Sequence, residues 1–152
     1  MKQNPESQYV TEQLANRTRL VYLLVGDLRD LLSEQLDCSE RKWVSAILDA
    51  LVESLHSLHE LKARGGYMQE VIDERPCWAN RVRHLQDEYR RLYSQLQNLQ
   101  CMIGVCSDEQ FGQRVESIQR ELRDWMMWFV SHERHESRLL QTAFLIDVGG
   151  GD

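Results

Sequence analysis

Proline and glycine are scarce in this chain of 152 residues, which holds only 2 prolines and 8 glycines. Both residue types interrupt helices, whereas the abundant leucine, glutamine, glutamate and arginine favour them. The alternating apolar and polar pattern of a half-buried strand is also missing, while apolar residues recur at helical spacing along most of the chain. These features predict an all-α fold.

Several function classes lose support because their sequence features are absent. No apolar stretch reaches the ~18 residues of a membrane-spanning helix, and the first residues hold no apolar signal region. Charges of both signs are interspersed to a net −6, without the basic block typical of nucleic-acid binding. No Ser-His-Asp order, phosphate loop or nucleotide fingerprint occurs. We therefore expect a cytoplasmic, non-enzymatic protein without membrane or nucleic-acid partners.

The four cysteines do not follow the spacing of a zinc site. Because the chain has no secretory signal, we expect reduced thiols, with a disulfide between two of them as the alternative. The residues concerned are Cys38, Cys77, Cys101 and Cys106.

Helical periodicity predicts four long helices joined by short connections. Gly65-Gly66 marks the end of the second helix, and Ser107 or Asp108 caps the fourth. The apolar stripe of the second helix includes Trp43 and Ile47, and that of the first includes Leu24 and Leu31. The long helices are predicted at about 10–36, 41–65, 76–103 and 108–147, with a short helix at 67–74.

Short connections imply that neighbouring helices run antiparallel. The predicted architecture is therefore an up-down-up-down antiparallel four-helix bundle over residues 9–147. Residues 1–8 and 148–152 are expected to form flexible ends.

His132 and Glu136 are four residues apart in the strongly amphipathic fourth helix. Residues at this spacing lie one turn apart on the same helix face, and both fall near the centre of the apolar stripe, as does Glu133. An imidazole and a carboxylate at that spacing can bind one metal ion in the core of a bundle. Because burying such a pair is costly, it needs partners. His135 points away from the stripe and is expected in solvent.

The same spacing occurs twice more, as His56–Glu60 and as His84–Glu88. Both pairs lie off the apolar stripes of their helices, so we interpret them as surface residues. His59 falls at the boundary of its stripe.

Three segments of the chain resemble the hemerythrin-like (HHE cation-binding) family. The most specific is His132–Gly150, His-Glu-Arg-His-Glu-Ser-Arg-Leu-Leu-Gln-Thr-Ala-Phe-Leu-Ile-Asp-Val-Gly-Gly, and the others are Ala63–Met68 and Arg81–Leu92. The resemblance implies a four-helix bundle with a di-iron or other metal site in its core. In the family pattern, helices one and three each supply a His, and helices two and four each supply His-x-x-x-Glu.

Carried over to this sequence, the family pattern is matched only by His132 and Glu136, on the fourth helix. The remaining ligand positions hold other residue types: Arg17 or Thr18 on the first helix, Leu58 and Lys62 on the second, and Tyr89 on the third.

The leading functional hypothesis is a hemerythrin-like bundle that has lost its di-iron site and its cofactor. It would serve as a non-enzymatic structural, regulatory or interaction module with a protein partner that the sequence does not identify. Buried carboxylates need a positive charge once a metal is gone. We therefore predict that Arg17 or Lys62, which face Glu133 and Glu136, forms an ion pair with Glu136.

The alternative hypothesis is an iron-binding protein with a reduced site around His132, Glu136 and Tyr89, acting in iron or oxygen sensing. Glu133 is a further candidate ligand of that site. A homodimer is also expected if Trp128, together with an exposed Leu139 or Ile146, forms an apolar face.

Overall fold

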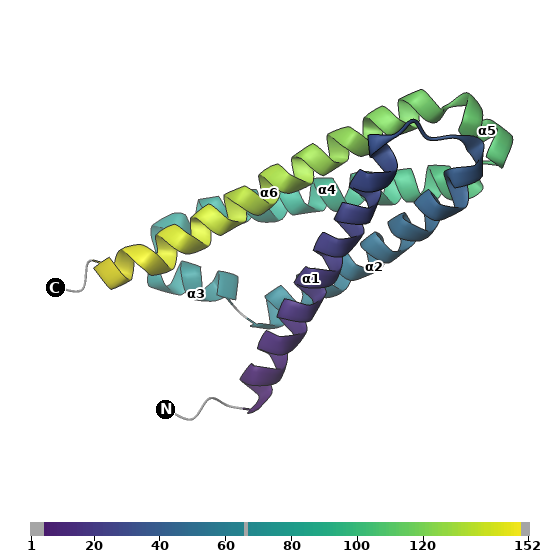
Figure 1. The fold of residues 1–152 in the computed structure, drawn as a ribbon. Coiled ribbons are helices and arrows are strands. Elements are labelled where there is room, and N and C mark those ends of the chain that lie inside the picture. The colour runs from purple at the N-terminus through teal and green to yellow at the C-terminus, as the bar shows by residue number, and fades with distance from the viewer. Residues whose placement is uncertain (1–4, 66, 150–152) are drawn as a thin grey trace.

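A computed structural model describes residues 5–65 and 67–149, and all regular structure within these ranges is helical. The predicted all-α fold is thus confirmed. Short connecting helices link the ends of the long ones (Figure 1). The elements are α1 (Pro5–Ser33), the 3-10 helix η1 (Cys38–Glu40), α2 (Arg41–Gly65), α3 (Tyr67–Glu74), the 3-10 helix η2 (Pro76–Trp78), α4 (Ala79–Val105), α5 (Asp108–Gln113) and α6 (Val115–Gly149).

The four long helices pack along one another around a shared apolar core. Contacts join α1 to α2, α2 to α4, α4 to α6, and α6 back to α1. Trp125 of α6 is fully buried at the centre, where its indole Nε1 donates to the Leu92 carbonyl at 2.9 Å. Each long helix contributes residues at helical spacing, including Val21, Leu28, Leu48, Leu51, Leu96, Ile103 and Leu122.

A second, smaller cluster of buried residues lies under α3. It joins α3 to α4 and to the C-terminal half of α6, and its members are Val71, Val82, Leu85, Leu139 and Ala143. In Figure 1 the N-terminal end of α1 lies apart from the C-terminal end of α6, and α3 lies beside the C-terminal part of α6. Leu139, which we expected on an exposed dimer face, is 6% exposed and belongs to this cluster. Trp128 is 49% exposed, while the side chain of Ile146 lies outside the described residues.

The helix boundaries differ from the prediction at both ends of the chain and within the predicted fourth helix. α1 begins at Pro5, so residues 5–8 are helical although we expected them outside the domain; proline suits a first helical turn. The predicted fourth helix is divided into α5 and α6, with Arg114 between them. The expected cap is confirmed at Ser107, which forms a capping box with Gln110. Val148 and Gly149, which we expected in the flexible C-terminal end, belong to α6. Residues 1–4 and 150–152 of the predicted flexible ends lie outside the described ranges, and so does Gly66.

In the first two apolar stripes, some of the predicted inward positions were wrong by one residue, although Val21, Leu28 and Leu51 are buried. Trp43 is 69% exposed, and Val44 is buried in its place. Val25 and Leu32 of α1 are likewise buried, whereas Leu24 and Leu31 are half-buried. One residue turns a helix by about 100°, so runs of adjacent apolar residues leave the inward direction ambiguous in the sequence.

No helix within the described ranges combines the length and the apolar character needed to cross a membrane.

Candidate site: an ion-paired cluster beside a cavity

His132 and Glu136 are two buried polar residues on α6. They are 4% and 9% exposed, as the amphipathic pattern predicted. His132 Nε2 lies 3.7 Å from Glu136 Oε2, a separation too long for a direct hydrogen bond.

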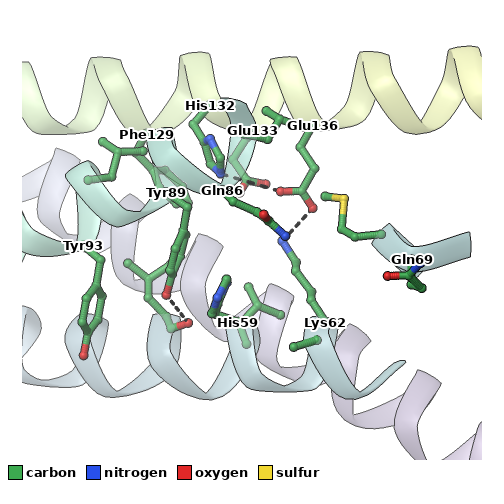
Figure 2. Close-up of a pocket in the computed structure, with 16 residues that line it drawn as sticks. His59, Lys62, Gln69, Gln86, Tyr89, Tyr93, Phe129, His132, Glu133 and Glu136 are labelled. Carbon is green, nitrogen blue, oxygen red and sulfur yellow. Dashed lines mark hydrogen bonds and ion pairs between the residues drawn. The ribbon is translucent and has the colours of Figure 1, made fainter. Parts of the chain in front are cut away.

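Lys62 of α2 supplies the cation that Glu136 was predicted to need. Its Nζ donates to Glu136 Oε1 at 2.7 Å, and the two side chains are 19% and 11% exposed (Figure 2). The expected ion pair is therefore confirmed for Lys62. Arg17, the other candidate cation, is half-buried on α1.

Glu88 of α4 completes a polar cluster with His132, Glu136 and Lys62. The sequence interpretation did not include Glu88 in the site. Its Oε1 lies 2.8 Å from His132 Nδ1 and 3.1 Å from His135 Nδ1. The prediction that Glu88 is a surface residue was wrong, because its side chain is partly buried against His132. His135 is exposed as expected, although its ring contacts Glu88. His84, the other member of the His84–Glu88 pair, is exposed as expected. The side chain of Glu88 is long enough to reach from α4 to α6. Its position directly before Tyr89 is the only feature of the sequence that could have indicated this contact.

The electrostatics of Glu88 follow from these contacts. Partial burial raises the pKa of the carboxyl, but the hydrogen bonds and charges of His132 and His135 outweigh burial and lower the pKa below its ordinary value. The carboxylate is therefore an acceptor, and His132 donates through Nδ1–H.

Tyr89, the predicted third ligand, presents its ring and not its oxygen to the centre. Its hydroxyl donates to the Leu55 carbonyl at 2.9 Å, so Figure 2 shows the oxygen pointing to α2, away from His132. The ring stacks on His59, with centroids 4.2 Å apart and 7° between the planes. Burial, followed by the charge of Tyr93, raises the pKa of Tyr89 well above its usual range. The hydroxyl therefore stays protonated, whereas a metal binds the phenolate.

Glu133 also has a protein partner. It accepts a hydrogen bond at 2.9 Å from the hydroxyl of Tyr22, which reaches across from α1. Burial and the negative charge of Glu133 together raise the pKa of Tyr22 to about 12. Glu133 therefore takes part in a hydrogen bond that joins α6 to α1.

The remaining histidine pair is where the sequence predicted it. His56 Nε2 lies 3.4 Å from Glu60 Oε1, and both side chains are more than half exposed. His59, one turn from His56, is half-buried, and its pKa is lowered by burial first and by the charge of Lys62 second. It is neutral at physiological pH.

A cavity of about 230 Å³ adjoins the cluster. It lies between α2, α3, α4 and α6, and Figure 2 shows His132 and Glu136 on one side of it, with Tyr89, His59 and Lys62 on the other. Most of its wall is apolar and includes Leu55, Leu58, Leu85, Leu92 and Phe129.

The donor set does not fit a two-metal centre. Such a centre takes carboxylates and imidazoles from several helices of a bundle. Here the Lys62 ammonium group is bonded to Glu136, and the Glu88 carboxylate is bonded to His132 Nδ1. Within the described ranges, no three or more His, Cys, Asp and Glu residues are arranged to hold a metal ion. All four cysteines are free thiols.

Comparisons with protein-family models, with curated proteins and with solved structures found no match to this chain.

Proposed function

We propose that this chain is a hemerythrin-like, up-down-up-down four-helix bundle in which an ion pair replaces the metal centre. It acts as a non-enzymatic structural, regulatory or interaction module. The ring of contacts among the four long helices and their short connections supports the bundle topology. The inward position of the His132–Glu136 pair supports the family resemblance.

The Lys62–Glu136 bond carries the proposal. Position 62 is where the family resemblance expects a glutamate ligand, and the Lys62 ammonium lies 2.7 Å from the one carboxylate that matches the family pattern. A divalent cation would have to displace this ammonium and also compete with its positive charge. The pair therefore supplies the neutralising charge that buried carboxylates require.

Metal analysis of protein produced with iron, zinc and manganese tests the proposal. We expect no stoichiometric metal in the wild type, and Glu136→Gln changes stability without changing metal content. Stoichiometric iron in the wild type that disappears in Glu136→Gln overturns the proposal and favours the alternative, an iron-binding sensor.

Restoring the second helical motif gives a complementary test. Leu58→His with Lys62→Glu removes the cation and places a second His-x-x-x-Glu opposite His132 and Glu136, giving four candidate ligands. We expect this variant to gain about one equivalent of bound Co²⁺ or Zn²⁺, because these ions take imidazole and carboxylate ligands. The native His56–Glu60 pair is the matched control, since it has the same spacing on the same helix but faces solvent. If the double variant folds but binds no more metal than the wild type, the assignment of positions 58 and 62 is wrong.

A further inference from the structure

A groove between α4 and α6 is lined by basic side chains. It has a volume of about 700 Å³, and its wall includes the buried side chains of Leu85 and Leu139. Among the residues that the structure describes, no carboxylate lines this groove. It therefore differs in charge from the chain as a whole, whose net charge is −6. The ionisable residues of its lining, all exposed, are Arg81 and His84 from α4 and His135 and Arg138 from α6.

The charges of the two arginines are unpaired. In the described part of the chain, neither Arg81 nor Arg138 forms an ion pair. Arg81 instead lies against the ring of Trp78, with its guanidinium carbon 5.3 Å from the ring centroid, and this contact orients the guanidinium. Arg138 also borders a groove between α1 and α6, but Glu133 of that groove accepts from the Tyr22 hydroxyl. Two unpaired like charges at one groove repel each other, and a bound anion removes that repulsion.

The carboxylate of Glu88 contacts the groove only through His135. Its Oε1 lies 3.1 Å from His135 Nδ1 and 2.8 Å from His132 Nδ1, and Glu88 does not line the groove. Its charge is therefore engaged by two imidazoles, and the arginines are left for a ligand. His84 is three residues from Arg81 and so lies on the same helix face. A histidine carries at least one N–H donor in any protonation state, so His84 adds a hydrogen-bond donor to the groove.

We propose that this groove binds a phosphate group, held by the guanidinium groups of Arg81 and Arg138 and by the imidazole of His84. A guanidinium forms paired hydrogen bonds with phosphate oxygens, and the two arginines belong to helices that contact each other. Charges more than about 8 Å away are largely screened at physiological ionic strength, so the local arginines outweigh the net negative charge of the chain. Free phosphate and a phosphate monoester share this chemistry.

The phosphate site does not rest on the proposed function, because neither Lys62 nor Glu136 lines the groove. It would give a regulatory module a ligand. His135 connects the groove to the buried cluster, since Glu88 contacts both His135 and His132.

An NMR titration of the full chain with inorganic phosphate and with glycerol 3-phosphate tests the proposal. Glycerol is the uncharged control for the monoester, and sodium chloride at matching ionic strength controls for screening. We expect saturable shifts of amides near Arg81 and Arg138 with both phosphates, with a Kd on the order of 1 mM from a few charge-assisted contacts. Neither control should saturate. The tighter of the two phosphates shows whether the groove prefers the free anion or an ester. Absence of saturable shifts with both phosphates, or equal shifts with sodium chloride, overturns the proposal.

Paired arginine variants locate the site. Arg81→Gln and Arg138→Gln each remove one charge from the groove and should weaken phosphate binding by about tenfold. Arg83→Gln and Arg120→Gln remove the same charge from exposed positions of the same two helices outside the groove, so they should weaken binding by less than about twofold. If the second pair weakens binding as much as the first, phosphate responds only to overall charge and the assignment to this groove is wrong.

Thermal unfolding gives a second measurement on the same variants. A ligand that binds the folded state raises the Tm, but phosphate also stabilises folded proteins by exclusion from their surface. The comparison between variants separates the two effects. We expect phosphate to raise the Tm of the wild type and of Arg83→Gln by more than that of Arg81→Gln. An equal rise in all three proteins contradicts specific binding in the groove.

Discussion

Individual residues of the cluster are held in place by contacts between helices. Glu88 links α4 to α6 through His132 and His135, and Lys62 links α2 to α6 through Glu136. Charged groups are tolerated at this depth only when they are paired. The contacts of the cluster therefore depend on one another, because removal of one member leaves the charge of its partner unpaired.

Replacing Glu88 with glutamine should lower stability in a pH-dependent way. The pKa of Glu88 is lower in the folded chain than in the unfolded chain, so its carboxylate stabilises the fold above the unfolded value of ~4.3. That contribution is lost as the pH falls through the folded pKa. We expect wild type to exceed Glu88→Gln by about 1 kcal/mol at neutral pH, with the difference fading below pH ~4.

Urea unfolding at a series of pH values measures this difference. Glu60→Gln is the matched control, because Glu60 is also paired with a histidine but is exposed; its effect should stay within about 0.5 kcal/mol. A Glu88→Gln effect that does not change with pH would contradict the assigned cause.

At the scale of the elements, a buried glutamine of α6 joins that helix to the C-terminal end of α1. The last turn of α1 contains no basic residue, and the final carbonyl groups of a helix need partners. Gln119 of α6, 7% exposed, donates to the carbonyls of Leu32 and Glu34 and accepts from the Leu36 amide. Arg123 adds a second bond to Leu32. The end of α1 is therefore capped by side chains that are distant in the sequence.

Gln119→Leu tests this cap. The substitution keeps the size of the side chain but leaves buried backbone groups without a partner, so we expect a loss of about 2 kcal/mol in the free energy of unfolding. Gln97→Leu, at an exposed position of α4, should change stability by less than about 0.5 kcal/mol. Equal midpoints of urea unfolding for the two variants would show that the cap contributes little.

At the scale of the whole molecule, the residues that the structure describes form two apolar clusters of unequal size. The large one joins the four long helices, whereas the small one attaches α3 to α4 and α6. A helix as short as α3 is not stable alone and depends on tertiary contacts. The α3 end, which also bounds the cavity, should therefore open more readily than the rest of the protein.

Native-state hydrogen exchange should separate the two clusters. Val71 and Val44 are both fully buried, one in each cluster. Val71→Ala should lower the free energy of opening of α3 amides by roughly 2 kcal/mol and leave α4 amides near Leu96 unaffected. Val44→Ala should instead lower protection throughout the chain. If Val71→Ala destabilises both regions equally, the two clusters form one cooperative unit.

Much of the fold and part of the site could be predicted from the sequence. Periodicity and the scarcity of helix breakers determined the all-α class, the short helix α3 and the Ser107 cap, because these depend on local propensity and spacing. The inward orientation of His132 and Glu136 followed from the same periodicity, and the need to neutralise a buried carboxylate predicted a cation at Lys62 or Arg17.

Only the tertiary structure decided which side chains meet across helices. Periodicity gives the direction of a residue to within about one position, which left Trp43 in the wrong place and Glu88 outside the predicted site. The choice of Lys62, the turn of the Tyr89 hydroxyl toward Leu55 and the cavity beside them depend on distances between helices. Such distances arise from the packing of the assembled core, and no local pattern in the chain encodes them.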